Sequence, residues 1–173
     1  LDALTAGFQG GDLVILAGRP AMGKTAVALN FASNAARMTG KTVAVFSLEM
    51  PTNQLAARML ACEAEVNSRE MRTGHLRDQD IERLVAGVRR MNEWSIQIDD
   101  TAGATVMDVR SKCRRIASER DLPPLGMIVI DYLQLMRAPT ARSREQEISE
   151  ISRNLKGLAK ELSVPIIALS QLN

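Results

Sequence analysis

The octapeptide Gly18-Arg19-Pro20-Ala21-Met22-Gly23-Lys24-Thr25 matches the phosphate-loop pattern G-x-x-x-x-G-K-[ST] at every position. An apolar run at residues 13–17 precedes the octapeptide and predicts a buried parallel strand. Residues 25–32 follow it and predict a helix. Strand, glycine-rich loop and helix occur in the order that phosphate binding requires, so the whole octapeptide is expected to surround a bound nucleotide.

The residue types in this loop suit a nucleoside triphosphate with Mg²⁺. Backbone N–H groups must converge on phosphate oxygens, and side chains at Gly18 and Gly23 would obstruct that approach. Lys24 is expected at the β- and γ-phosphates, Thr25 is expected to offer its hydroxyl to Mg²⁺, and the next helix points its positive end at the same anions. A chance match on a glycine-rich turn is the alternative, which the flanking strand and helix disfavour.

Composition and charge limit the number of domains and the kinds of partner that the chain can have. The 173 residues are 46% hydrophobic and 24% charged, enough for one sizeable core, so a single domain over residues 1–173 is expected. The formal net charge of +2 is too small to indicate a polyanion partner by itself. The chain begins with Leu1 and stops directly after a strand pattern, and it is therefore expected to be an incomplete piece of a longer protein.

The cysteines and the apolar runs favour a cytoplasmic protein. Cys62 and Cys113 are far apart and form no C-x-x-C motif, which disfavours a disulfide framework or a zinc site and fits a reducing compartment. Both are interpreted as packing residues. No apolar run approaches the roughly 20 residues of a membrane span, and the amino terminus lacks a signal pattern, so no membrane partner is expected.

Apolar patterns predict four further strands that alternate with helices. The strands are expected at residues 42–47, 96–100, 127–131 and 165–169. Helices are expected at residues 54–64, 78–94, 105–120 and 143–163. Residues 78–94 carry an apolar stripe that predicts a helix covering one face of the sheet, and either Thr105 or the turn before it is expected to cap the next helix. The alternation predicts an α/β layered fold with a parallel sheet.

Three polar residues end predicted strands and are candidates for the chemistry. Asp131 is expected to hold the Mg²⁺ shell, the alternative being a helix cap or a loop acid. Glu49 is expected to polarise the water that attacks the γ-phosphate, the alternative being a solvated acid before a proline-started helix. Gln171 is expected to sense the γ-phosphate through its amide, although its composition equally fits a loop residue.

Five segments together resemble replicative DNA helicases of the DnaB type. They are residues 18–25, 47–50, 129–136, 147–162 and 168–173. The first motif is shared by many ATPases, but the combination is specific, and the resemblance covers nearly the whole chain with its spacing preserved.

The resemblance implies a RecA-like motor domain with a mostly parallel five-stranded sheet, in the order 3-2-4-5-1 with helices on both faces. It implies a ring of six that hydrolyses ATP at subunit boundaries and pulls single-stranded DNA through its centre. Lys24 and Thr25 would bind phosphate and Mg²⁺, Asp131 would hold the metal, Glu49 would be the general base, and Gln171 would couple the γ-phosphate to DNA-binding loops. A primase and a helicase loader are the implied partners.

Parts of the family's pattern lie outside residues 1–173. The family also has an amino-terminal helical domain, a linker helix that docks on the next subunit, a DNA-contacting loop and an arginine finger. An arginine finger is worth about 10³ to 10⁵ in rate in related NTPases. The piece alone is therefore expected to bind nucleotide but to hydrolyse it poorly.

Two basic clusters bear on DNA contact. Arg137, Arg142 and Arg144 lie on a predicted loop after the metal strand, and Arg142 and Arg144 are candidates for contact with DNA phosphates. A solvated basic loop is the equal alternative. The cluster at residues 110–115 lies on a helix whose other face is apolar, so its cations are interpreted as a solvated or subunit-facing surface.

Two further functions remain as alternatives to the helicase motor. One is a non-catalytic module in which ATP binding only stabilises assembly, and Glu49 distinguishes it from an enzyme. The other is a RecA-type recombinase, which the run Asp131-Tyr132-Leu133-Gln134-Leu135-Met136 disfavours.

Overall fold

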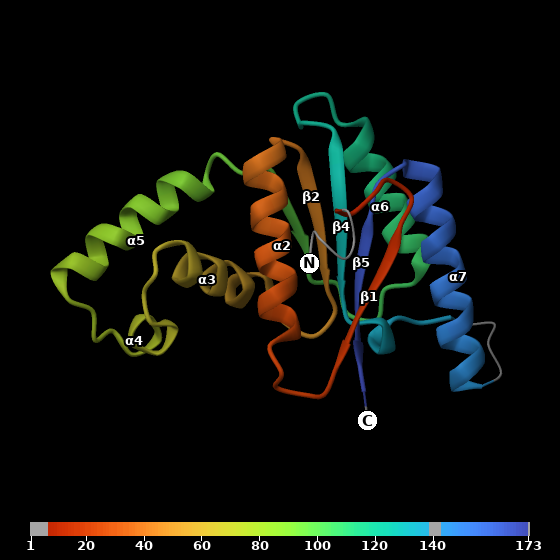
Figure 1. Ribbon diagram of the computed structural model, residues 1–173, viewed down its shortest axis with the longest axis horizontal. Coiled ribbons are helices and arrows are strands. Elements are labelled where there is room, and N and C mark those ends of the chain that lie inside the picture. Colours follow the sequence, from red (N-terminus) through yellow and green to blue (C-terminus); the bar gives the residue numbers. More distant parts are fainter. Residues whose placement is uncertain (1–6, 139–142, 173) are drawn as a thin grey trace.

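Five parallel strands form one sheet in the order β1-β5-β4-β2-β3 (Figure 1). The strands are β1 Leu13–Gly18, β2 Thr42–Ser47, β3 Ile96–Asp99, β4 Leu125–Asp131 and β5 Ile166–Gln171. This computed structural model describes residues 7–138 and 143–172. Read from its other edge, the strand order is 3-2-4-5-1, so the expected order is confirmed, and every pairing within the sheet is parallel.

Helices cover both faces of this sheet, as the α/β prediction requires (Figure 1). They are α2 Lys24–Thr39, α3 Thr52–Glu63, α4 Ser68–Thr73, α5 Asp78–Met91, α6 Val106–Ser118 and α7 Arg144–Leu162, with a short 3₁₀ turn, η1, at Leu133–Leu135. Helix α2 packs on one face of the sheet with α3 beside it, and α6 and α7 pack on the other.

Strand β2 shows how one strand supplies both cores. All its residues are buried, and successive side chains point to opposite faces. Val43 and Val45 join the cluster under α2 and α3, whereas Ala44 and Phe46 join the cluster under α6 and α7. A strand covered on both faces is apolar along most of its length, and the apolar run at residues 43–46 is the pattern that predicted it.

The ends of two helices carry well-known capping residues. The Thr105 hydroxyl accepts a hydrogen bond from the backbone N–H of Asp108, and the Asp108 carboxylate accepts from the backbone N–H of Thr105. This capping box confirms Thr105 as the cap of α6. Gly40 ends α2 with a φ of +63°, a left-handed conformation that glycine adopts without strain.

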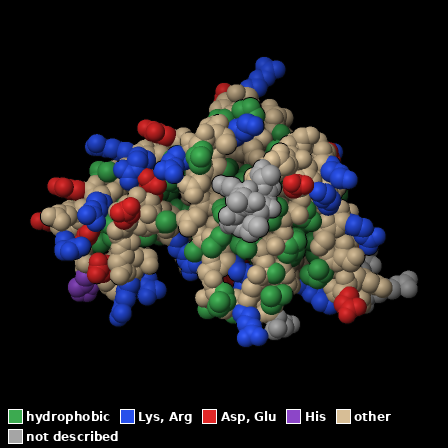
Figure 2. Space-filling model, in the orientation of Figure 1, with side chains coloured by type: hydrophobic (Ala, Val, Ile, Leu, Met, Phe, Trp, Pro, Cys, Tyr) green, Lys and Arg blue, Asp and Glu red, His purple; other side chains and the backbone are tan. Residues whose placement is uncertain are grey.

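The predicted position of α5 is wrong. The helix packs against α3 and lies beyond it, to one side of the sheet (Figure 1). Gly87 makes this packing close, since a Cβ there would lie 3.1 Å from Leu60 and 3.3 Å from the Cβ of Ala64. Consequently Ile81, Val85 and Val88, expected to face the sheet, are 48%, 50% and 43% exposed. Side chains of both charge signs are interspersed over this region in Figure 2.

The two cysteines differ in their surroundings. Cys113 is fully buried in the α6–α7 core, where burial raises the pKa of its thiol to about 12, so its assignment as a packing residue is confirmed. Cys62 is exposed, and its interpretation as a packing residue is wrong. It lies on the side of α3 that faces α2, where its thiol donates to Asn30 Oδ1 at 3.2 Å.

In the parts of the chain that the structure describes, no helix has both the length and the apolar character to cross a membrane.

The carboxyl ends of β1, β2, β4 and β5 meet at one edge of the sheet. Gly18 at the end of β1 pairs with Gln171 at the end of β5, and Ser47 at the end of β2 pairs with Asp131 at the end of β4. Ligands collect at this edge in open parallel sheets. The fold therefore gathers at one place the side chains that follow these strands.

Candidate active site

A cleft of about 310 Å³ lies at the carboxyl edge of the sheet and contains most of the predicted site residues. Residues 20–25 of the phosphate loop line it, together with Glu49, Asp131 and Gln171. Gly18 and Arg19 do not line the cleft; they form the base of the loop where β1 ends. Segments that are up to about 150 residues apart in sequence thus enclose one space.

The phosphate loop turns into α2 through Gly23. This residue has a φ of +80° and caps the helix without any side-chain hydrogen bond, which leaves backbone N–H groups of the first turn directed to the cleft. A Cβ at Gly23 would meet nothing within 4 Å, so within the protein the need for glycine is conformational rather than steric. At Gly18 a Cβ would lie 3.5 Å from the Lys24 side chain, an ordinary contact.

The Lys24 side chain lies back over its own loop. Its ammonium donates to the carbonyl oxygens of Gly18 at 2.8 Å and Arg19 at 3.0 Å. These two bonds hold a positive charge beside the helix terminus of α2 and at the wall of the cleft. A fixed cation next to free backbone N–H groups is an arrangement suited to a polyphosphate anion.

Thr25 and Asp131 form the part of the cleft that suits a metal ion. The Thr25 hydroxyl donates to Asp131 Oδ2 at 2.7 Å. Burial raises the pKa of the Asp131 carboxyl, and the hydrogen bond from Thr25 and the nearby charges of Lys24 and Arg58 partly oppose this shift. A hydroxyl and a carboxylate are hard oxygen donors of the kind that Mg²⁺ prefers, so the residues present fit the ion.

Glu49 reaches the rim of the cleft because the chain turns directly after β2. The Ser47 hydroxyl donates to the Met50 carbonyl at 2.7 Å and accepts from the Met50 N–H at 3.2 Å. These bonds close a tight turn around residues 48 and 49, with Leu48 buried and Glu49 exposed. The carboxylate is therefore open to water at the side of the cleft opposite the β1–β5 pair.

Gln171 lies next to the base of the phosphate loop. It pairs with Gly18 across the sheet, and the following N–H, that of Leu172, donates to the Gly18 carbonyl at 3.1 Å. The side chain of Gln171 lines the cleft. Any movement of the phosphate loop is thereby linked to the end of β5 through main-chain hydrogen bonds.

Comparison with known proteins gives a family for this fold and cleft. The family model for the DnaB-like helicase C terminal domain matches residues 1–173. The chain belongs to this family. It is 50% identical over 175 residues to the replicative DNA helicase DnaC of Bacillus subtilis (strain 168) and 51% identical to the replicative DNA helicase DnaB of Geobacillus stearothermophilus. All of this chain is covered in both alignments, and it spans 38% of the length of each relative.

Solved structures of the DnaB family agree with the fold. The ATPase domain of G40P is similar with a TM-score of 0.91 and 35% identity, covering 99% of this chain and 61% of that one. A DnaB-like replicative helicase described with its interactions with primase is similar with a TM-score of 0.90 and 35% identity, covering 98% of this chain and 41% of that one. These similarities confirm the RecA-like fold class.

Arg58 is a site residue of this DnaB-family domain that the sequence patterns did not indicate. It lies on α3 and lines the same cleft as Glu49 and Asp131. Among the described residues its guanidinium has no hydrogen-bond or ion-pair partner, and it contributes a positive charge that favours ionised Asp131. Nothing in the helical pattern of α3 marks Arg58, because an exposed arginine on a helix is ordinary.

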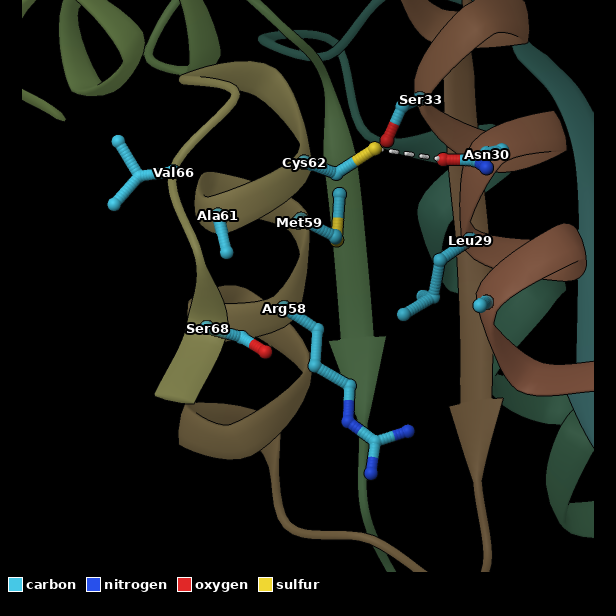
Figure 3. A pocket seen from close by; sticks show the side chains of 10 residues that line it. Leu29, Asn30, Ser33, Arg58, Met59, Ala61, Cys62, Val66 and Ser68 are labelled. Atoms are coloured by element: carbon cyan, nitrogen blue, oxygen red, sulfur yellow. Dashed lines mark hydrogen bonds between the residues drawn. The ribbon is translucent and has the colours of Figure 1, made fainter. Parts of the chain in front are cut away.

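A second pocket of about 430 Å³ adjoins the cleft between α2 and α3 and shares Ala26 and Arg58 with it (Figure 3). Leu29 and Met59 form its apolar floor, and the hydrogen bond between Cys62 and Asn30 closes its far end. Figure 3 shows the Arg58 guanidinium extending away from Cys62. Arg58 therefore lies at the junction of the two spaces.

The residues expected to contact DNA remain a prediction. Arg142 lies outside the described residues. Arg144 is the first residue of α7, and its exposed guanidinium donates to the Glu147 carboxylate and to the backbone carbonyl of Gln134. Arg137 is exposed where β4 leads toward α7. In the second cluster, Arg110 and Arg114 both pair with Glu161 of α7, which ties that surface to the domain itself.

Proposed function

We propose that this chain is the ATPase motor core of a hexameric replicative DNA helicase, which hydrolyses ATP with Mg²⁺ to move along single-stranded DNA and unwind the duplex. The observation that carries the proposal is the meeting of Lys24, Thr25, Glu49, Asp131 and Gln171 around one cleft. Membership of the DnaB family supports the same function.

Each residue has a chemical role in this proposal. Backbone N–H groups of residues 20–25 and the Lys24 ammonium bind the phosphates, and Lys24 exchanges its bonds to loop carbonyls for bonds to phosphate oxygens. Thr25 and Asp131 would hold Mg²⁺, which when bound neutralises charge on the phosphates. Gln171 donates its amide to the γ-phosphate and so registers whether that phosphate is present.

Glu49 is the proposed general base. An exposed carboxylate on the rim can accept a proton from the water that attacks the γ-phosphate, whereas the buried Asp131 accepts from Thr25 and would hold Mg²⁺. Their positions thus suit Glu49 to proton transfer and Asp131 to metal binding.

The test of this function is the Glu49→Gln variant of the full-length protein. Glutamine keeps the size of the side chain but cannot take up a proton, so steady-state ATP hydrolysis should fall by about 10² or more while ATP binding stays within twofold. Glu82→Gln, an exposed change on α5 away from the cleft, is the matched control and should leave both unchanged. Normal turnover by Glu49→Gln would show that another group is the base, whereas no ATP hydrolysis by the native full-length protein would make the chain a non-catalytic module.

The ring and its partners belong to the longer protein. The chain spans 38% of the length of its Bacillus relative, and we propose residues 1–173 as an incomplete RecA-like core whose neighbours in the full chain include a helical domain and further strands. Single-stranded DNA, a primase and a helicase loader are the proposed partners. Measuring the mass of the full-length protein with and without ATP tests the hexamer, and adding forked DNA to the same sample tests unwinding.

Residues 1–173 in isolation should bind ATP but hydrolyse it poorly. The proposed hydrolysis needs an arginine from a neighbouring subunit, and such an arginine is worth about 10³ to 10⁵ in rate in related NTPases. Strong turnover by the isolated piece that rises with added DNA would contradict this expectation.

A further inference from the structure

Gln134 makes an unusual set of hydrogen bonds beside the cleft. It lies on η1, three residues after Asp131, and its Nε2 donates to the Gln171 carbonyl at 3.0 Å and to the Ser170 hydroxyl at 2.9 Å. Its Oε1 accepts from the Gln171 N–H at 3.2 Å. A single carboxamide therefore satisfies both main-chain groups of Gln171.

This side chain replaces a strand that has ended. The ladder between β4 and β5 stops at the pair Ile130 and Ala168, whereas β5 continues to Gln171 beside β1. Beyond that point the side of β5 that faces β4 would carry an unpaired N–H and C=O at Gln171. The planar amide of Gln134 presents one donor and one acceptor side by side, as a neighbouring strand would, and keeps the end of β5 in the sheet.

The main chain of Gln134 makes a second connection. Its carbonyl accepts from the Arg144 guanidinium at the start of α7, and Arg144 also pairs with Glu147. Glu147 in turn accepts from the backbone N–H of Ala138 at 3.1 Å. These bonds join both described ends of the basic connection between η1 and α7 to the residue that holds Gln171.

We propose that Gln134 is a positioning residue for ATP hydrolysis: it fixes the main chain of Gln171 at the cleft and ties it to the basic connection before α7. The inference rests on the proposed function. Gln171 can report on the γ-phosphate only if its backbone is held in register with the phosphate loop, and Gln134 supplies that restraint from the Asp131 side. The same bonds link a shift of Gln171 to Arg144.

The experiment uses the full-length protein and the variant Gln134→Met. Methionine has nearly the same length but lacks both the donor and the acceptor. We expect kcat to fall about tenfold or more, because small misplacements of reacting groups carry costs of this order. The KM and the dissociation constant for ATP should stay within twofold, and the stimulation of hydrolysis by single-stranded DNA should be lost. Unchanged kcat and unchanged DNA stimulation would overturn the proposal.

Two controls match this change. Ser170→Ala removes one acceptor of the Gln134 amide and keeps both bonds to the Gln171 main chain, so its kcat should stay within twofold. Gln97→Met makes the same substitution at an exposed position of β3 and should have no effect. If Ser170→Ala lowers kcat as strongly as Gln134→Met, the bonds to Gln171 are not the cause.

A double-mutant cycle separates positioning from general destabilisation. If Gln134 acts through Gln171, adding Gln134→Met to Gln171→Met should cause no further loss of kcat, whereas independent effects would multiply. Should Gln134→Met fail to fold, Gln134→Glu serves instead, because it keeps the acceptor for the Gln171 N–H and loses only the donors. The native full-length protein measured in parallel distinguishes the failures, since an absence of ATP hydrolysis there would reject the proposed function itself.

Discussion

The Thr25 hydroxyl donates to Asp131 Oδ2 at 2.7 Å, although 106 positions separate the two residues in the chain. The bond joins the first turn of α2 to the end of β4, and it brings together the two oxygen ligands that the proposed magnesium site needs. Because Asp131 is buried and Thr25 is its one side-chain partner among the described residues, the stability of the fold at the cleft and the proposed chemistry depend on the same carboxylate.

Replacing Asp131 with Asn should stabilise the protein in the absence of metal and abolish hydrolysis. Burial raises the pKa of Asp131 above its ordinary 3.8, so ionising this carboxyl costs stability in the folded state. That cost is absent at low pH and sets in as the pH rises from 3.8 through the raised pKa. Thermal unfolding in EDTA from pH 4 to 8 should show the variant gaining about 1 to 4 °C at neutral pH and losing this advantage in acid.

The control for that measurement is Asp121→Asn, an exposed acid before β4, which should leave the melting temperature unchanged across the range. Equal melting of Asp131→Asn and the native protein at every pH would show that Asp131 is not strained by its burial.

Arg58→Ala should slow ATP hydrolysis by roughly 100- to 1,000-fold, the order that one charge-stabilising donor contributes in an active site. The guanidinium is a cation without a partner in the described chain and shares the cleft with Glu49 and Asp131, so it is placed to stabilise charge on the γ-phosphate. Arg120→Ala removes an exposed arginine just beyond the end of α6 and should not change the rate. Steady-state hydrolysis by full-length Arg58→Ala at the native rate would contradict this role.

Removing Arg142 and Arg144 should reduce the salt dependence of single-strand binding. Each arginine that no longer neutralises a phosphate lowers the slope of log K against log salt by about 0.7 for single strands. Full-length Arg142→Ala should show a decrease of this size, whereas Arg144→Ala should show less, because Glu147 and the Gln134 carbonyl already bind its guanidinium. An unchanged slope when both arginines are replaced would remove this segment from the DNA surface.

Thr105→Ala should destabilise the domain without touching the cleft. The loss of a capping-box hydroxyl costs about 1 kcal/mol, or roughly 2 to 4 °C in melting temperature for a protein of this size. Thr105→Ser keeps the oxygen that accepts from the Asp108 N–H and should restore most of the loss. If the Thr105→Ala and Thr105→Ser variants melt at the same temperature, the cap contributes nothing to stability. Both variants should bind ATP with native affinity.

Much of the fold follows from local patterns in the chain. Residues 43–46 are all apolar because β2 is covered on both faces, and the structure places β2 over the predicted residues 42–47. The α5 segment shows the limit of such patterns. Its periodicity correctly predicted a helix with an apolar face, but not that Gly87 would let the opposite side pack against α3 and leave Val85 exposed.

Sequence patterns likewise indicate some residues of the candidate site and not others. Lys24, Asp131 and Gln171 are marked by spacing, since each lies where a strand or loop pattern ends. Arg58 and Gln134 carry no such mark, because one is an ordinary exposed residue of a helix and the other lies within a run of apolar residues. Their importance comes from what lies beside them after folding.

The order of residues alone therefore determined a parallel α/β domain with a phosphate loop and polar side chains at its strand ends, because hydrophobic period and glycine spacing are local properties. Only the tertiary structure decided that Thr25 bonds to Asp131 and that Gln134 completes the end of β5. Those contacts depend on which strands become neighbours and on where each strand ends. No local sequence pattern encodes either property.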